Sequence, residues 1–198
     1  RDQALAISGL LSERLGGPSV GPYQPAGLWD DIVERGQVYR QSQGEDLYRR
    51  SLYTFWKRTR GPPAMVTFDA STREVHILGP SRTNTPLQAL NLMNDVTYAE
   101  AARALAERAM GEGTTVGESV SYMYRLATAH EPDLETRSIL ADAFTGHFDQ
   151  YQTDRAGALL LVSAGESPRN ETLDIAELAA YQMVASLILN LDQTITRD

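Results

Sequence analysis

The sequence contains no cysteine and only three histidines among its 198 residues. Without cysteine there can be no disulfide framework, no cysteine-ligated zinc site and no haem attached through a Cys-x-x-Cys-His motif. The histidines, His76, His130 and His147, are far apart in the chain and show none of the spacings of a helical zinc site. We therefore predict that this chain binds no metal and holds no cofactor of its own.

Long hydrophobic runs and excess positive charge are also missing. No apolar stretch reaches the roughly 20 residues that a helix needs to span a bilayer. The nearest candidate, Leu178 to Leu191, is interrupted by Gln182 and Ser186 and is more typical of a buried helix. The net charge of -8 at pH 7 gives the whole chain a field that repels polyanions. We predict no membrane span and no nucleic-acid partner.

The phosphate-binding motifs of common nucleotide enzymes are absent, because no Walker loop occurs and no Gly-x-Gly-x-x-Gly follows a predicted strand. Carboxylates are plentiful, but their spacing does not define an acid and base pair. The sequence therefore leaves open whether the chain is an enzyme.

The most unusual stretch is Tyr48 to Arg60, YRRSLYTFWKRTR, which contains four aromatic and five cationic residues in thirteen positions. We predict a helix over residues 45–60, ended by the Gly-Pro-Pro that follows. Helical spacing places one apolar stripe beside a second stripe of aromatic and guanidinium groups. The apolar stripe is Tyr48, Leu52 and Phe55, and the second is Arg49, Tyr53, Trp56 and Arg60.

The second stripe has two interpretations. Aromatic rings flanked by guanidinium groups suit sugar faces or anions, and the same side chains also stack inside protein cores. We favour the structural interpretation, and the exposure of Tyr53 and Trp56 distinguishes the two.

A polar run comes next at residues 81–95, SRTNTPLQALNLMND. Its Thr85, Pro86 and Gln88 predict a capping box at the start of a helix. Arg82, Asn84 and Gln88 could hold an anion or a sugar hydroxyl at that helix N-terminus, although capping and loop bracing is the interpretation we favour. We expect Arg49, Tyr53, Trp56, Arg82 and Asn84 to form one cluster, with Asp69, Glu74 and Asp95 as carboxylate partners.

Apolar residues at helical spacing predict further helices along the rest of the chain. In the capped helix we expect Leu87, Leu90 and Leu92 or Met93 to face inward. Residues 174–194 are apolar on nearly all sides, which indicates the centre of a bundle. The predicted fold is mainly α, a single helical-bundle domain over residues 1–198 with long ordered loops and at most a small β-hairpin near residues 65–78. The other predicted helices cover residues 1–15, 98–109, 118–129 and 132–148, and residues 156–163 form a short apolar segment.

Five segments are distinctive as a set: RRSLYTFWKRT at 49–59, FDAS at 68–71, SRTNTPLQALNLMND at 81–95, EAARALAER at 100–108 and LNLDQTITR at 189–197. Together they resemble the planctomycete-specific domain of unknown function found at the C-terminus of large planctomycete and verrucomicrobial proteins. The resemblance covers essentially the whole chain. One departure is Val96, where that family often has proline after its Asn-Asp pair.

The resemblance implies an exported, extracytoplasmic protein in which a cytochrome-c-like domain precedes this one, so that any haem belongs to the rest of the polypeptide. The chain begins directly with a helical pattern, and we interpret it as a C-terminal fragment of that longer polypeptide. The family supplies no catalytic residues.

We therefore expect a binding or scaffolding module whose partners are other domains of the same polypeptide. The alternative is a carbohydrate-active or polysaccharide-linked redox domain, in which the arginine and aromatic residues line a cleft for a glycan or anionic ligand.

Overall fold

The structure is a computed structural model that describes residues 1–28, 39–57, 61–71 and 83–196. These ranges contain helices and no β-strand, so the prediction of a mainly α fold is confirmed. Two isolated parallel bridges, Ser12 with Arg49 and Val20 with Thr54, are the extended pairings between described residues. The α-helices are α1 (Asp2–Ser8), α2 (Pro63–Thr67), α3 (Pro86–Asn94), α4 (Val96–Glu112), α5 (Val116–Thr128), α6 (Leu134–Thr153), α7 (Arg155–Val162), α8 (Ile175–Leu189) and α9 (Asp192–Ile195), and the 3-10 turns are η1 (Gly44–Tyr48) and η2 (Ser51–Tyr53).

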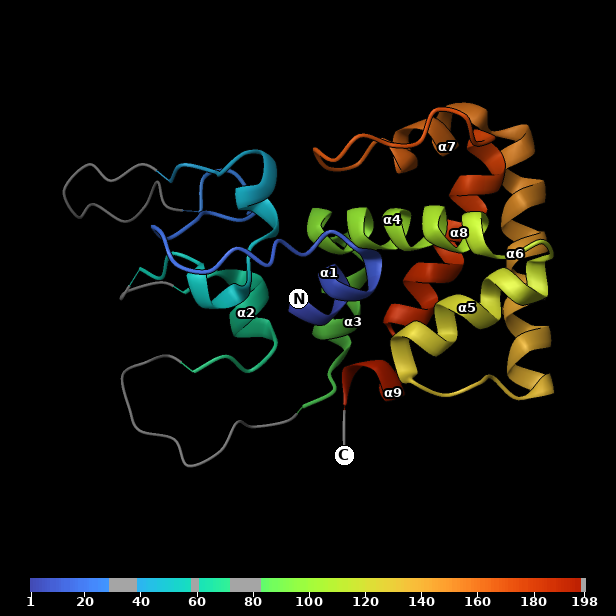
Figure 1. Cartoon of the computed structure of the whole chain (residues 1–198), viewed down its shortest axis with the longest axis horizontal. Helices are drawn as coiled ribbons and strands as arrows, with labels where there is room; N and C mark the ends of the chain where they lie inside the picture. The colour runs from blue at the N-terminus through green and yellow to red at the C-terminus, as the bar shows by residue number, and fades with distance from the viewer. Residues whose placement is uncertain (29–38, 58–60, 72–82, 197–198) are drawn as a thin grey trace.

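Helix α8 lies at the centre of the bundle, as its apolar sequence predicts. It packs against α4, α6 and α7 and also touches α5 (Figure 1). Leu178, Val184 and Ile188 have no exposed surface, whereas Leu187 is 41% exposed. A helix that is apolar on nearly all sides is stable in water only when neighbours cover most of it, and here one side remains partly open at Leu187.

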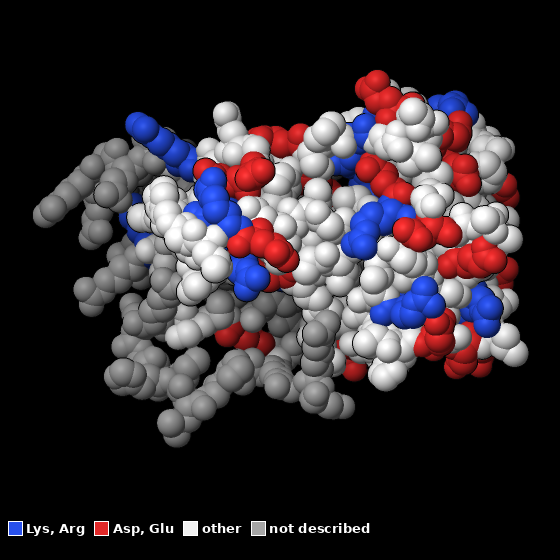
Figure 2. Space-filling view, viewed as in Figure 1, with Lys and Arg blue, Asp and Glu red and all other residues white. Residues whose placement is uncertain are grey.

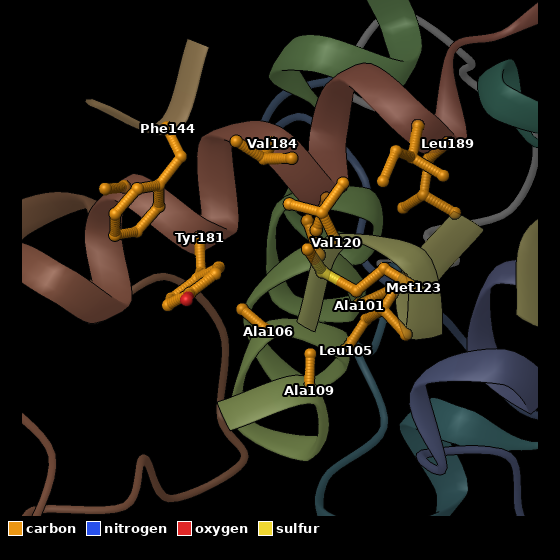
Figure 3. Close-up of a cluster of buried hydrophobic side chains, with 14 of the residues drawn as sticks. Ala101, Leu105, Ala106, Ala109, Val120, Met123, Phe144, Tyr181, Val184 and Leu189 are labelled. Atoms are coloured by element: carbon orange, nitrogen blue, oxygen red, sulfur yellow. The ribbon is translucent and has the colours of Figure 1, made fainter. Parts of the chain in front are cut away.

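Helix α4 makes the most extensive contact with α8, and small side chains make that contact close. Ala101, Ala102, Ala106 and Ala109 are fully buried together with Leu105 (Figure 3). Alanine has a short side chain, so the two helix backbones approach closely and each larger side chain fits a groove opposite. The core is therefore built from many small contacts around a few larger residues.

Helix starts agree closely with the sequence because the capping signals are local. Thr85 accepts a hydrogen bond from the Gln88 amide and Gln88 Oε1 accepts one from the Thr85 amide, which is the predicted capping box. Asp95 ends α3 and caps α4 through the Thr97 amide. A second capping box, Thr115 with Glu118, starts α5.

The predicted helix over residues 45–60 is wrong. The described part of that range forms η1 and η2, separated by extended residues. The expected apolar stripe breaks up accordingly, since Tyr48 is buried, Leu52 is 77% exposed and Phe55 is 40% exposed. The helical spacing of apolar residues in this stretch therefore does not correspond to a helix. The contacts of Arg49, described below, explain why the helix does not form.

Two other boundaries also differ from the prediction. The first helix ends at Ser8 rather than near residue 15, because Gly9 adopts a left-handed conformation with φ 83° and closes the helix with its own amide. Met65 to Phe68, expected as half of a hairpin, lies in and directly after α2. The other half, Glu74 to Leu78, lies outside the described residues.

Residues 9–28 and 39–57 form the N-terminal arm, which lies beside the N-terminal half of α4 (Figure 1). Its Leu47 and Tyr48 form a second small core together with Leu5 of α1. On the bundle, acidic and basic side chains are intermixed rather than gathered into one patch on the face that Figure 2 shows. The arm carries three of the predicted site residues, Arg49, Tyr53 and Trp56, so its internal contacts decide what those three residues can do.

Candidate functional site

Arg49 is fully buried in the N-terminal arm, and its guanidinium group is occupied by backbone carbonyl groups. It donates to the carbonyl oxygen of Pro18 at 3.1 Å, to that of Arg14 at 3.2 Å, and to that of Gly16. Its guanidinium carbon lies 3.8 Å from the centre of the Tyr53 ring. Arg49 thus braces the loop at residues 14–18, and the stacking with Tyr53 is the structural interpretation favoured above.

The start of the chain is fastened to the same segment in the same way. Arg1 donates to the carbonyl oxygens of Leu47 at 2.6 Å and Arg49 at 2.7 Å. Asp2 accepts from the Ser51 amide at 2.8 Å and from the Ser51 hydroxyl at 2.6 Å. Because these backbone groups have no helix or sheet to pair them, charged side chains supply their hydrogen bonds.

A buried polar network joins the arm to the bundle at Glu100 of α4. The Tyr48 hydroxyl donates to Glu100 Oε1 at 2.8 Å, and the Ser167 amide donates to the same oxygen at 2.6 Å. Arg103, one turn along α4, donates to the Ser167 carbonyl at 2.7 Å and to Glu107 at 3.1 Å. Glu100 and Arg103 are both almost fully buried, so the charges offset each other inside the protein.

The phenols beside Glu100 are held in their protonated form. Burial, and then hydrogen bonding to Glu100, raises the pKa of Tyr48. Burial is also the main cause that raises the pKa of Tyr23 to about 12. Gly165 packs directly on the carboxylate with φ 88°, where a Cβ atom would overlap Glu100. The Glu100 side chain is fully buried and closely packed, and its Oε2 atom has no hydrogen-bond partner within the described ranges. The close packing suits a structural joint better than a place for substrate.

The predicted polar run is placed away from this network. Gln88 is buried and donates to the Thr67 carbonyl at 3.0 Å and to the Thr83 hydroxyl at 2.9 Å, while Asn84 donates to Asp192 at 2.6 Å. Asp69 accepts from the Thr83 amide at 3.0 Å. These contacts brace the loop before α3 against α2 and α9.

The expected single cluster is therefore divided among the residues that the structure describes. No hydrogen bond or ion pair within the described ranges joins Arg49 or Tyr53 to Asn84, Gln88 or the two described carboxylates. Asp69 contacts Thr83, and Asp95 serves as the cap of α4. Tyr53 and Trp56 are both half-buried. Their exposure lies between the burial expected for a structural stack and the exposure expected for a ligand site. Arg60, Arg82 and Glu74 lie outside the described residues.

Sequence reasoning missed the Glu100 network, although its signal is present in the segment EAARALAER. Glu100, Arg103 and Glu107 recur at spacings of three and four, so they share one face of α4. A charged row at this spacing normally lies on the solvent side of a helix. Here alanines occupy the opposite face of α4. The charged face is also buried, because Tyr48 and Ser167 lie against it.

A match to the hydrolase pattern Gly-x-Ser-x-Gly at Gly17–Gly21 was also missed. That pattern is catalytic when its serine stands on a sharp turn between a strand and a helix. Ser19 is instead exposed in an extended loop that Arg49 braces, and the histidine side chains within the described ranges make no hydrogen bond to it. The match therefore carries no catalytic interpretation.

The described ranges contain neither a candidate metal site nor a helix that could cross a membrane. In those ranges no group of three or more histidine, aspartate or glutamate side chains could hold a metal ion. Among the same residues, no helix is long and apolar enough to cross a membrane.

The outer side of α3 exposes three large apolar side chains. Leu87, Leu90 and Met93 are 60%, 58% and 54% exposed, whereas Leu92 is buried. The expectation that Leu87 and Leu90 face inward is wrong, because the buried side of this short helix is filled by Gln88 and Leu92. We call the row of Leu87, Leu90 and Met93 the α3 face.

Comparison with known proteins gives one family. No match was found among curated proteins or among solved structures. A family model named PSD1, described as a protein of unknown function (DUF1553), matches residues 1–144. That range includes the N-terminal arm, α3, α4 and the Glu100 side of the network, and it confirms the family resemblance through four of the five segments, since the segment at 189–197 lies outside the matched range. The chain belongs to the PSD1 (DUF1553) family, a domain of unknown function found in planctomycete proteins.

Proposed function

We propose that this chain is a binding or scaffolding module that docks another domain of its own polypeptide through the α3 face. The observation that carries the proposal is the composition of residues 83–94, which contain no charged residue in a chain where 22% of residues are charged. Three large apolar side chains on that segment are more than half exposed. Apolar rows of this kind on a soluble surface are typical of protein contacts.

The way in which α3 is held supports a docking role. Its start is fixed by the Thr85 capping box and by the hydrogen bonds of Gln88 to Thr67 and Thr83. A partner would therefore meet a helix that is already ordered, and would not have to pay the entropy of forming it. The absence of charge favours an apolar partner surface over an acidic or basic one.

The buried polar groups of the arm and of α4 support a non-catalytic role. Arg49 and Glu100, which have the charge and burial that active sites often use, are occupied by carbonyl groups, a phenol and an amide. Their contacts hold segments together, and they leave little room for a substrate.

The wider setting is part of the proposal and rests on the family resemblance. The polypeptide is exported and acts outside the cytoplasm, and a cytochrome-c-like domain with its haem lies in the portion that precedes this chain. That portion is the expected partner of the α3 face. This chain itself contributes no haem ligand through cysteine.

The test uses two separately expressed pieces, this chain and the preceding portion of the same polypeptide, mixed and measured by isothermal titration calorimetry. We expect a complex that Leu90→Glu weakens at least about tenfold, because a charge would be buried against an apolar surface. Leu160→Glu is the matched control, since Leu160 on α7 is 79% exposed and lies outside the α3 face. Equal loss in both variants, or no complex at all, would contradict the proposal.

The carbohydrate alternative is tested in the same preparation with a glycan array. Saturable glycan binding that is lost in Trp56→Ala and kept in Leu90→Glu would favour it over docking. The full burial of Arg49 argues against it, because a guanidinium group that already bonds to carbonyl groups is not available to a sugar.

A further inference from the structure

Met93 is the most exposed of the five methionines, and it lies on the α3 face. Met93 is 54% exposed, whereas Met65, Met110 and Met183 are half-buried and Met123 has no exposed surface. All five positions fall within the described ranges. The methionine most open to solvent is thus part of the surface proposed for docking.

The α3 face depends on Met93 for its apolar character at one end. Leu87, Leu90 and Met93 follow one another at a spacing of three residues, so they lie on one side of α3, with Met93 near its C-terminal end. No charged residue occurs between residues 83 and 94. One of the three large side chains in this uncharged row therefore carries a thioether, which oxidation makes polar.

The hydrogen bonds that hold α3 in place come from other side chains. Thr85 and Gln88 fix the start of the helix, and Leu92 fills its buried side. Asp95 caps the next helix through the Thr97 amide. A chemical change at the Met93 sulfur therefore alters the α3 face and leaves these hydrogen bonds intact.

Hydrogen peroxide oxidises a methionine by transferring one oxygen atom to its sulfur. The sulfur lone pair attacks a peroxide oxygen, the S–O bond forms as the O–O bond breaks, and the remaining oxygen takes up a proton and leaves in water. Sulfur loses two electrons and the peroxide gains them. The sulfoxide oxygen accepts hydrogen bonds, and an apolar partner surface offers it no donor, so docking would bury an unpaired polar group.

The bundle core is protected from the same reaction. Susceptibility to oxidation follows exposure, and Met123 is packed in the core with no exposed surface. Peroxide reaches the Met93 side chain without any opening of the protein. Oxidation therefore starts on the α3 face and leaves the bundle folded.

We propose that Met93 is an oxidation site that controls docking: the thioether form of the α3 face binds the partner surface, and the sulfoxide form releases it. The inference rests on the proposed docking function and adds a chemical control to it. Reductases that act on the two sulfoxide epimers regenerate the thioether, so the control is reversible.

The first measurement is the order of oxidation. The folded chain is treated with dilute hydrogen peroxide, and peptide mass spectrometry follows the sulfoxide at each methionine. We expect Met93 to react at least about threefold faster than Met65, Met110 and Met183, and Met123 to react most slowly. Equal rates at Met93 and at the three half-buried methionines would contradict the proposal.

The second measurement is calorimetric titration with the preceding portion of the same polypeptide, in which only this chain has been oxidised and then freed of peroxide. We expect oxidation to weaken binding about tenfold, because the sulfoxide loses its hydrogen bonds to water on docking, and reductase treatment to restore the affinity.

Variants assign the effect to one sulfur atom. Met93→Leu keeps an apolar side chain without sulfur, so it should bind as the wild type does and keep its affinity after peroxide. Met93→Gln is polar without any oxidant and should bind about tenfold more weakly from the start. Met65→Leu is the matched control, since Met65 lies on α2, which contacts α3, and this variant should remain sensitive to peroxide.

The outcomes separate this inference from the docking function. If the untreated chain forms no complex, the docking function and this inference both fail. If the untreated chain binds and the chain with Met93 sulfoxide binds equally well, docking stands and its control by oxidation is wrong. Peroxide that weakens the Met93→Leu complex as much as the wild-type complex leads to the same conclusion, because another residue is then responsible.

Discussion

The helical bundle and the N-terminal arm are stabilised by different kinds of contact. In the bundle, α4 and α8 meet through fully buried alanines and leucines, and the backbone hydrogen bonds are satisfied within each helix. The arm has two 3-10 turns and long extended segments, and its backbone groups bond directly to Arg49 of the arm and to Arg1 and Asp2 at the start of α1. Charged side chains thus do for the arm what regular secondary structure does for the bundle.

The difference teaches how an irregular segment can be ordered without a sheet or a long helix. A buried backbone carbonyl needs a donor, and a guanidinium group can serve several carbonyls at once because it has five N–H groups in one plane. Arg49 uses this geometry on three carbonyl groups. We expect the bundle to respond mainly to lost volume and the arm mainly to lost hydrogen bonds.

The largest expected effect is on the bundle, in Leu105→Ala. Leu105 is fully buried between alanines of α4 and the neighbouring helices, so its removal leaves a cavity that rigid helices cannot close. We expect the free energy of unfolding to fall by about 2 to 5 kcal/mol in chemical denaturation. Leu134→Ala, at a position that is 79% exposed, is the control and should change stability by less than about 0.5 kcal/mol. A similarly small decrease in the free energy of unfolding in both variants would mean that the bundle core is loosely packed.

A smaller and more local effect is expected in the arm, in Arg49→Met. Methionine can fill much of the space but donates no hydrogen bond, so the carbonyl groups of Arg14, Gly16 and Pro18 lose their donor. We expect local opening of the arm to become easier by about 2 to 3 kcal/mol, the penalty of unpaired buried polar groups. Native-state hydrogen exchange measures it at the amides of Val20 and Phe55, which bond across the arm.

The control for this variant is Arg14→Met, because Arg14 is half exposed and pairs with Asp46 on the surface. It should leave exchange in the arm nearly unchanged. If Arg49→Met instead lowers the global stability of α8 amides as much as those of Val20 and Phe55, the arm and the bundle unfold as one unit and the contrast between them fails.

The smallest effect is expected for Asp174→Ala, which removes the side-chain cap at the start of α8. Asp174 accepts hydrogen bonds from the Ala176 and Glu177 amides and from Arg155. Loss of the cap should cost about 1 kcal/mol at neutral pH, measured by thermal denaturation.

This cost should depend on pH. The Arg155 hydrogen bond, followed by that of the Glu177 amide, lowers the pKa of Asp174 below its ordinary value of 3.8. A lowered pKa in the folded state means that the carboxylate stabilises the fold fully above pH 3.8 and loses this contribution as pH falls through the lowered pKa. The wild type and Asp174→Ala should therefore converge in acid. Arg155→Ala should shift the convergence to higher pH, and a difference that does not depend on pH would show that the charge of Asp174 is irrelevant.

The sequence was sufficient to predict the elements whose signals are local. Thr85, Pro86 and Gln88 mark the start of α3 because a capping box needs only four consecutive residues. The continuous apolar character of α8 indicated a central helix before any neighbour was known. In such cases the residues that define the feature are also the residues that make its contacts.

The arm could not be predicted in this way, because its decisive contacts are distant in the sequence. Arg49 has the spacing of a helical residue, and only the loop at residues 14–18 explains why it does not form a helix. The partner of Tyr48 is Glu100, fifty-two positions away. The prediction of a single cluster was wrong for the same reason, because Asn84 donates to Asp192, which is distant in the sequence.

The long separations across the Glu100 network also bear on the order in which the protein takes shape during synthesis. Within this chain the arm is made before the bundle, yet the Tyr23 hydroxyl accepts from the Glu166 amide and Gln41 donates to the Glu166 carboxylate, 143 and 125 positions later. Ser167, whose amide donates to Glu100, follows immediately. A ribosome adds on the order of 5 to 20 residues per second, so these groups of the arm wait roughly 6 to 30 seconds for their partners. We expect the arm to close only after the turn that follows α7 has emerged, and to be exposed to proteases and chaperones until then.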